Sequence, residues 1–328
     1  MRYANLNPAA TTSSMKDLRR WRKERAGKMK HKDFSWVVPT AAAARAYKKD
    51  AANGEPSIVW VGHSTFLIRH SGLNIVTDPV WAGSMGFQKR LTKPGIAMNE
   101  MPKVDVILLS HSHYDHLHLP SVKALAGQTE ATLIVPVGLA AMLRRKGYSS
   151  VIELQWWESA TVGGAKFTFV PAQHWTRRTL TDTNRSHWGG FIIEDMTADR
   201  ERQPEPTVYF AGDSGYFEGF KQIGERFDID VALMPIGAYE PEWFMRMQHV
   251  SPEEALQAFL DVKAKVFVPM HYGAFALADD TPREAIDRLE AERARLGIEP
   301  ERILTLALGE VLALGNAPRM QEQNRNEK

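Results

Sequence analysis

The feature of this sequence that most constrains its fold is a series of short apolar runs, which alternate with helix-length segments from residue 57 onward. Each run has the length and the β-branched content of a strand. The predicted strands lie within 58–70, 72–79, 104–111, 131–137, 166–174, 189–194, 207–215, 230–237, 265–271 and 303–308. The predicted helices are 121–127, 138–146, 215–226, 252–263 and 282–296. Strands and helices interleaved in this way predict a layered α/β (α+β) domain.

The sequence divides into three parts, which differ in pattern and in charge. No Pro- or Gly-rich linker interrupts the alternation of strands and helices, so we expect residues 51–315 to form one domain, followed by a polar tail at 316–328. Residues 1–50 hold 13 Lys or Arg against four Asp or Glu, which leaves 28 basic and 35 acidic residues for the rest of the chain. We expect these first residues to form a basic arm, partly helical or disordered, with a helix over 16–32.

A basic arm on an acidic body indicates an anionic partner for the arm. A phospholipid surface fits better than nucleic acid, because an acidic body is unsuited to following a phosphate backbone. The sequence has no apolar stretch long enough to span a bilayer and no secretory signal. We therefore expect a cytoplasmic protein whose arm is suited to peripheral attachment on the inner membrane face. A homodimer is the default expectation for a soluble enzyme.

A dense set of metal-ligand side chains follows the most apolar of the predicted strands. Directly after that strand the sequence reads His111-Ser112-His113-Tyr114-Asp115-His116. Alternate residues of an extended segment point the same way, so His111 and His113 can hold one ion. Once the chain turns, Asp115 and His116 can face a second ion. Cysteine is absent from the chain, and imidazole and carboxylate without thiolate suit zinc, iron or manganese.

Three more candidate ligands stand at the ends of other predicted strands. His174 ends the run KFTFVPAQH, Asp213 ends TVYFAGD and His271 ends KVFVPMH. Each apolar run would bring its polar residue to the same edge of a sheet. The complete set fits a two-metal site in which Asp213 bridges ions about 3.5–4 Å apart.

These motifs resemble those of the metallo-β-lactamase superfamily, whose fold is a four-layer αβ/βα sandwich. Within it, residues 57–312 are similar to the N-acylphosphatidylethanolamine-hydrolysing phospholipase D family and its bacterial relatives. The segments that carry the resemblance are WVGHSTFLI, TDPVW, LSHSHYDHL, QHWTRRTLTD, FAGDSGY, PIGAYEPEWFMRMQHVSPEEA and MHYGAFAL.

The resemblance implies two zinc ions, with iron or manganese as alternatives, and a role for each matching residue. One ion would be held by His111, His113 and His174, the other by Asp115, His116 and His271, with Asp213 between them. The candidate catalytic residues are Asp115, His249 and Arg178, and the candidate substrate contacts are Tyr114, Gln248, Arg178 and His249. Arg177 is an alternative to Arg178, and His63 is expected to be a neighbour of the ligands rather than a ligand.

The implied reaction is attack of a metal-activated hydroxide on the phosphodiester of N-acylphosphatidylethanolamine, which gives N-acylethanolamine and phosphatidate. Two alternatives use the same metals: a lactonase or other acyl hydrolase, and a nucleotide or RNA phosphodiesterase. A non-enzymatic metal-dependent sensor is disfavoured by the intact ligand set. The pattern of second-site ligands disfavours β-lactam hydrolysis.

Overall fold

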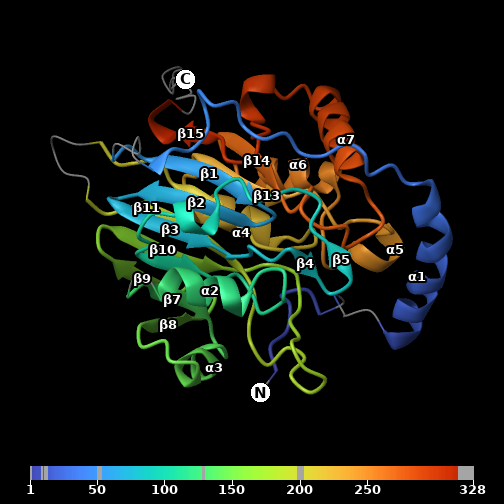
Figure 1. Cartoon of the computed structure of the whole chain (residues 1–328), viewed down its shortest axis with the longest axis horizontal. Helices are drawn as coiled ribbons and strands as arrows, with labels where there is room; N and C mark the ends of the chain where they lie inside the picture. Colours follow the sequence, from blue (N-terminus) through green and yellow to red (C-terminus); the bar gives the residue numbers. More distant parts are fainter. Residues whose placement is uncertain are drawn as a thin grey trace, which may run out of the picture.

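The computed structural model describes residues 2–8, 10, 14–49, 54–127, 130–197 and 203–316, and its centre is a pair of β-sheets (Figure 1). The first sheet has the order β15–β1–β2–β3–β6–β7–β8. Its strands are β1 (Ser57–Gly62), β2 (Thr65–His70), β3 (Leu73–Thr77), β6 (Val106–Leu108), β7 (Thr132–Pro136), β8 (Val151–Leu154) and β15 (Val311–Ala313).

The second sheet has the order β14–β13–β12–β11–β10–β9. Its strands are β9 (Ser159–Val162), β10 (Ala165–Val170), β11 (Gly190–Asp195), β12 (Val208–Phe210), β13 (Val231–Pro235) and β14 (Val266–Met270). A separate hairpin pairs β4 (Ser84–Met85) with β5 (Gln88–Lys89).

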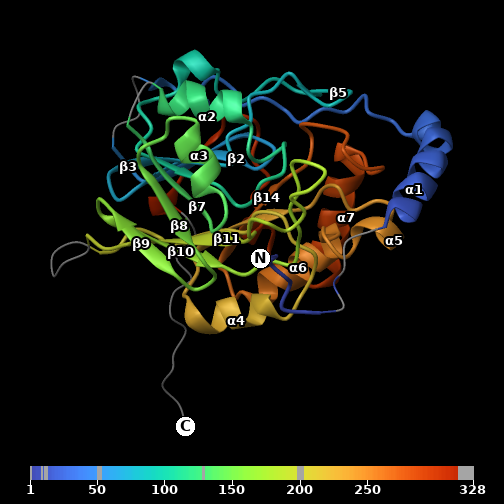
Figure 2. The same ribbon diagram turned by 90° about the horizontal axis from the view of Figure 1, so that it is seen from below.

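Helices cover the outer faces of the paired sheets. Figure 2 shows α2 (Leu119–Ala126) and α3 (Ala140–Arg145) on one side, and α4 (Gly219–Arg226) and α6 (Pro252–Asp261) on the other. The helix α7 (Pro282–Arg295) packs on α6, and the short α5 (Glu242–Met245) lies beside α1 (Met15–Lys28). This is the predicted four-layer αβ/βα sandwich, so the predicted fold class is confirmed.

The alternation of side chains along β1 shows how the sequence builds these layers. Ile58 and Trp60 belong to the core between the two sheets, whereas Val59 and Val61 pack in the second core beneath α2 and α3. Successive side chains of a strand point to opposite faces, so a strand that is apolar at every position is buried on both faces.

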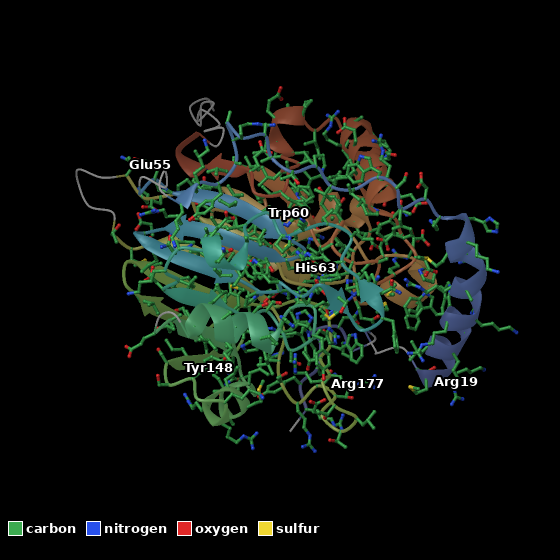
Figure 3. All side chains as sticks on the ribbon, in the orientation of Figure 1. Arg19, Glu55, Trp60, His63, Tyr148 and Arg177 are labelled. Atoms are coloured by element: carbon green, nitrogen blue, oxygen red, sulfur yellow. The ribbon has the colours of Figure 1, made fainter. Side chains whose placement is uncertain are left out.

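Parallel strands bring the candidate ligands to one edge. In the first sheet β3 and β6 are parallel, and in the second β12, β13 and β14 are parallel. Loops that follow parallel neighbours leave a sheet at the same edge. Near this edge Trp60 Nε1 donates to the His63 carbonyl at 2.9 Å, and Figure 3 shows both side chains in the middle of the molecule, with Arg19 at its outer side.

Two of the predicted strands are wrong. The segment 58–70 is a hairpin of β1 and β2, because His63 adopts a positive φ of 56° and reverses the chain. The segment 303–308 runs from the edge strand β14 of the second sheet toward the edge of the first, with Ile303 bridging Phe267 and Leu308 bridging Thr40, so it has no continuous partner and the strand forms later as β15. The predicted helix at 215–226 begins at Gly219.

The arm contains the predicted helix. A capping box of Ser14 and Asp17 starts α1, which ends at Lys28 and continues as a short 3₁₀ turn. Beyond it Val38 is buried in the main core. The predicted domain boundary at residue 50 and most of the predicted tail lie outside the described residues, and the division into arm and domain stays a prediction. Within the described part of the chain, no helix is both long and apolar enough to cross a bilayer.

The buried His187 makes the stability of this fold sensitive to acid. Its ring stacks on Tyr3 at 4.5 Å and lies tilted against Trp156 at 4.1 Å between ring centres, and burial lowers its pKa from 6.5 to about 4. Only the unfolded state takes up this proton between pH 6.5 and 4, so the stabilisation is complete above pH 6.5 and is lost as pH falls through that window. By pH 5 the loss amounts to about 2 kcal/mol.

We expect His187→Phe to remove this part of the pH dependence. The variant's free energy of unfolding relative to the unsubstituted protein should rise by about 2 kcal/mol from pH 7.5 to pH 5. Urea unfolding of both proteins at the two pH values measures it. An unchanged difference would show that His187 is protonated without cost in the folded protein.

Candidate metal centre

The loop after β6 carries four of the predicted ligands. Its first turn is held by a hydrogen bond from Leu117 N to the His113 carbonyl at 2.8 Å. Arg178 supports it from outside, since its guanidinium donates to the carbonyls of Ser112 at 2.7 Å and Leu117 at 2.9 Å. These hydrogen bonds hold the loop from inside and outside.

The first group of ligand atoms comes from His111, His113 and His174, whose ring nitrogens lie within 4.8 Å of one another. His113 Nδ1 is 2.9 Å from His111 Nε2 and 3.2 Å from His174 Nε2. An Asp213 carboxylate oxygen lies 3.9 Å from His111 Nε2 and 3.8 Å from His174 Nε2. The carboxylate thus adds an oxygen atom to the three imidazole nitrogens of this group.

The second group comes from Asp115, His116 and His271, together with His63. The Nε2 atoms of His116 and His271 are 3.3 Å apart, and an Asp115 oxygen lies 3.6 Å from the first and 3.7 Å from the second. Asp213 reaches this group too, at 3.0 Å from His116 Nε2 and 3.2 Å from His271 Nε2. The structure therefore brings all seven predicted ligands together, with Asp213 between the two groups.

The hydrogen bonds around these groups test whether a cation fits. His174 Nδ1 donates to the Gln248 carbonyl at 2.9 Å, and His116 Nδ1 donates to Asp78 at 2.7 Å. In these two rings the outer N–H faces an oxygen, which leaves the Nε2 lone pair facing the centre. Converging lone pairs repel one another unless a cation or a proton lies between them. The donor set fits a metal ion.

The charges of the site lead to the same conclusion. Burial lowers the pKa of His113 to about 4 and keeps the pKa values of His111 and His174 well below 6.5, so these rings are neutral at pH 7. Burial acts in the same direction on His271, but the Asp213 and Asp115 carboxylates outweigh it and raise its pKa to about 9. The first group presents neutral ligands, and the second attracts positive charge.

Unusual backbone conformations place several of these side chains. His63, Asp78 and His271 have positive φ values of 56°, 32° and 64°. Non-glycine residues adopt this region at a cost, and such residues concentrate at functional sites. Gly212 has a φ of 63°, and a Cβ there would lie 2.7 Å from Ser110 Cβ. Only glycine allows Asp213 to approach the loop after β6.

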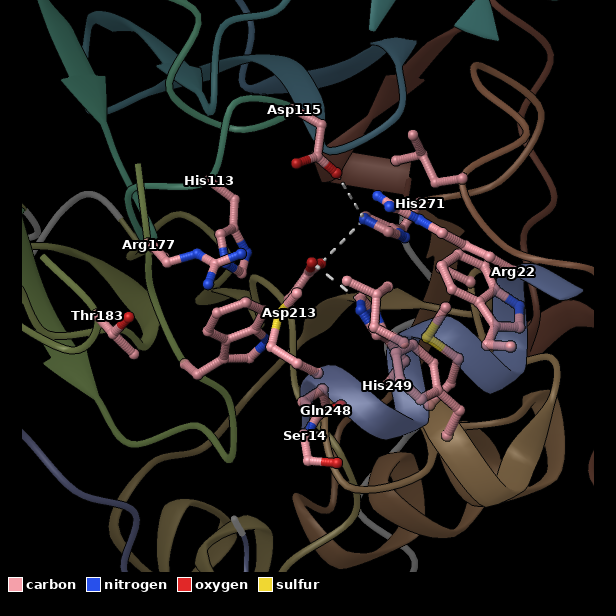
Figure 4. A pocket seen from close by; sticks show the side chains of 18 residues that line it. Ser14, Arg22, His113, Asp115, Arg177, Thr183, Asp213, Gln248, His249 and His271 are labelled. Atoms are coloured by element: carbon pink, nitrogen blue, oxygen red, sulfur yellow. Dashed lines mark ion pairs between the residues drawn. The ribbon is translucent and has the colours of Figure 1, made fainter. Parts of the chain in front are cut away.

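A cavity of about 460 Å³ opens directly over the two groups (Figure 4). Its floor includes Asp115, Asp213 and His271. The rest of its lining comes from His113, Leu277 and three parts of the chain, namely the helix α1 (with Ser14), the segment from Trp175 to Thr183, and the segment from 238 to 249. A metal centre at the bottom of a partly apolar pocket is the usual arrangement of an active site.

Two of the four predicted substrate contacts line this cavity. Gln248 and His249 do, and His249 Nδ1 lies 3.9 Å from Asp213. Tyr114 and Arg178 point elsewhere: the Tyr114 hydroxyl donates to the Arg178 carbonyl at 2.9 Å, and the Arg178 guanidinium lies 4.1 Å from the centre of the Tyr114 ring. Of the two adjacent arginines, Arg177 and not Arg178 lines the cavity.

The sequence alone missed Asp78 and the contribution of α1. The Asp78 carboxylate accepts from Ser110 N at 2.8 Å, from Ser110 Oγ at 2.5 Å and from His116 Nδ1 at 2.7 Å. Its position directly after a strand, in the segment TDPVW, is the same signal that identified the other residues. The pocket-facing residues of α1 carry no comparable signal.

Comparison with known proteins agrees with this site. Residues 73–272 match the family described as beta-lactamase superfamily domain. N-acyl-phosphatidylethanolamine-hydrolyzing phospholipase D 1 of Caenorhabditis elegans is 33% identical over 273 residues, which cover 77% of this chain and 74% of that protein. The mitochondrial enzyme of the same name from Saccharomyces cerevisiae is 34% identical over 242 residues, which cover 70% of this chain but only 50% of the yeast protein.

Among solved structures, a metallo hydrolase of the archaeon Ignicoccus hospitalis has the same fold, with a TM-score of 0.59 and 24% identity over 78% of this chain and 97% of that one. The family match includes all seven predicted ligands and the strands that precede them, and it ends one residue beyond His271. The chain is a metal-dependent hydrolase and belongs to the metallo-β-lactamase superfamily.

Proposed function

We propose that this chain is a dinuclear, zinc-dependent phosphodiesterase that hydrolyses N-acylphosphatidylethanolamine to N-acylethanolamine and phosphatidate. The observation that carries the proposal is the cavity, in which metal-ligand groups form the floor beneath apolar side chains, with Arg177 at one side. A phospholipid offers the matching parts, namely a charged phosphodiester and acyl chains. The activity named for the worm and yeast relatives supports the same substrate.

The proposed ions would be held by residues that already converge. His111, His113 and His174 would hold one, Asp115, His116 and His271 the other, and Asp213 would contact both. Divalent ions in such a site supply Lewis acidity and hydroxide near neutral pH.

The other side chains of the cavity bind and orient the substrate. Arg177 is suited to a non-bridging phosphoryl oxygen, because a guanidinium donates two parallel hydrogen bonds to such a group. His249 faces the centre, and its buried Nδ1 has no hydrogen-bond partner among the described residues. With a proton on this nitrogen, His249 is placed to donate a hydrogen bond to the leaving oxygen and then to transfer that proton to it as the bond to phosphorus breaks. The apolar wall keeps water from the reacting atoms.

The experiment that tests the function measures phosphatidate released from N-acylphosphatidylethanolamine in mixed micelles. We expect release by the zinc-loaded protein and none after the metal is removed with a chelator. Absence of release from protein shown to hold two ions would contradict the substrate while leaving the metal centre intact. Hydrolysis of lactones or of nucleotide phosphodiesters by the same sample would then identify which alternative holds.

Arg177→Ala is expected to raise KM for the phosphodiester roughly ten-fold, because a charge-assisted hydrogen bond to the substrate is lost. A neutral lactone should be affected much less. Arg185→Ala is the matched control, since this exposed arginine stands in the same loop but does not line the cavity. Equal effects of Arg177→Ala on charged and neutral substrates would favour an acyl hydrolase.

Three expectations from the sequence stay predictions, namely the membrane contact of the arm, a homodimer and the cellular compartment.

A further inference from the structure

The helix α1 is fixed against the main body of the protein beside the cavity. Trp21 Nε1 donates to the buried Asp279 carboxylate at 3.1 Å, and Arg25 pairs with the same carboxylate at 3.3 Å. Arg25 also donates to the Ala276 carbonyl at 2.7 Å, and the Trp21 ring stacks on Phe244 at 5.0 Å. These contacts hold the helix at the segment that follows His271 and at α5.

The residues before α1 are tied to the metal centre as well. Asn5 Oδ1 accepts from the backbone N–H of the candidate ligand His174 at 3.0 Å and from Trp188 Nε1 at 3.0 Å. Tyr3 N donates to the Asn184 carbonyl at 2.8 Å. The described parts of the N-terminal region therefore contact the candidate active site at two separate places.

One face of α1 forms a wall of the cavity. The residues that line it are Met15, Leu18, Trp21 and Arg22. Successive members of this set are three, three and one positions apart in the sequence, which places them on one side of a helix. Phe244, Met245 and Leu277 of the main body line the same cavity, and Phe244 is the residue on which Trp21 stacks. The cavity is apolar along this part of its wall, and it leads to the ligand groups.

Two arginines stand on opposite sides of this space. Figure 4 shows Arg22 and Arg177 to either side of Asp213, with the Arg22 side chain directed toward His271. Within the described residues neither guanidinium forms an ion pair within 4.0 Å. Arg20 on the same helix differs, because it pairs with Glu24. Two unneutralised guanidinium groups at one cavity indicate an anionic ligand.

We propose that α1 is a substrate-binding element of the active site, with Arg22 and Arg177 binding the anion of an amphiphile and the face Leu18–Trp21 binding its apolar chain. The ligand class is a phosphate ester or phosphonate that carries a long alkyl or acyl chain. This inference rests on the proposed function for the claim that the bound ligand is hydrolysed. The binding of the ligand can be tested independently of that function. The N-terminal region is then part of the catalytic domain and sets which phosphodiesters the metal centre receives.

The test measures binding of dodecylphosphonate to the zinc-loaded protein by titration calorimetry at 0.15 M salt. Its carbon–phosphorus bond leaves no ester to hydrolyse, so binding is separated from turnover. Methylphosphonate lacks the chain, and dodecyl maltoside lacks the anion. Arg22→Ala is compared with Arg19→Ala, a matched variant because Arg19 is exposed on the same helix and does not line the cavity. Leu18→Asn tests the apolar face.

We expect Arg22→Ala to weaken binding of both phosphonates roughly ten-fold or more, and Arg19→Ala to change it less than two-fold. Leu18→Asn should reduce the preference for dodecyl- over methylphosphonate and leave methylphosphonate binding unchanged. Equal losses in the two arginine variants would overturn the assignment of Arg22, since only the general charge of α1 would then matter. Equal binding of the two phosphonates would overturn the apolar wall. Arg22-dependent binding without phosphatidate release would uphold this inference and reject the proposed substrate.

Discussion

Asp213→Asn is expected to reduce hydrolysis by a factor of about 10³ or more and to lower the bound metal from two ions to at most one. The carboxylate is buried and lies within 3.0–3.9 Å of ring nitrogens in both ligand groups. An amide replaces one of its oxygens with a donor, which cannot contact a cation. One residue thus supports both groups, and its loss affects both.

The measurement pairs metal analysis with phosphatidate release on the same sample. Asp228→Asn is the control, since this exposed aspartate lies outside the cavity. Far-ultraviolet circular dichroism confirms that the variant is folded. A variant that keeps two ions and most of its activity would show that Asp213 does not join the groups.

Asp78→Asn is expected to weaken metal binding by roughly 10–100-fold without unfolding the protein. Asp78 is fully buried and accepts three hydrogen bonds, one of them from His116 Nδ1. The amide has nearly the same shape, but its NH₂ group cannot accept from this imidazole. His116 would then change tautomer and present N–H in place of a lone pair to the centre.

Competition with a chelator of known affinity measures this loss, and urea unfolding tests the fold. Asp105→Asn is a matched control, because the Asp105 carboxylate accepts from Asn74 N at 2.9 Å, before the start of β6 instead of after its end. Unchanged affinity in Asp78→Asn would mean that His116 binds without support from its neighbour.

The candidate ligand set could be predicted from sequence because of where its members stand. Asp213 and His271 follow strands of the parallel group, and His174 follows β10, which runs in the same direction because β11 is antiparallel to both β10 and β12. Strands that run in one direction carry the residues after them to one edge. The position of a polar residue directly after an apolar strand therefore predicted which distant residues meet in the folded protein. Their role as ligands stays a prediction, although the structure places them together.

Features that depend on side-chain direction could not be predicted in this way. Arg177 and Arg178 are adjacent and chemically identical, yet only Arg177 faces the cavity, whereas Arg178 supports the ligand loop. The hairpin turn at His63 was missed because apolar residues flank it on both sides. The packing of α1 against α5 depends on contacts between residues more than 200 positions apart, such as Trp21 with Phe244.

The candidate ligands are divided between the two sheets, with four following β6 in the first and three following strands of the second. Ions held by this set would bind only the folded chain, and each tenfold rise in free metal above the dissociation constant would add about 1.4 kcal/mol of stability per ion. Cellular proteases remove proteins according to the fraction that is unfolded. The supply of metal would therefore set how much of this protein a cell retains, and not only how fast each molecule works.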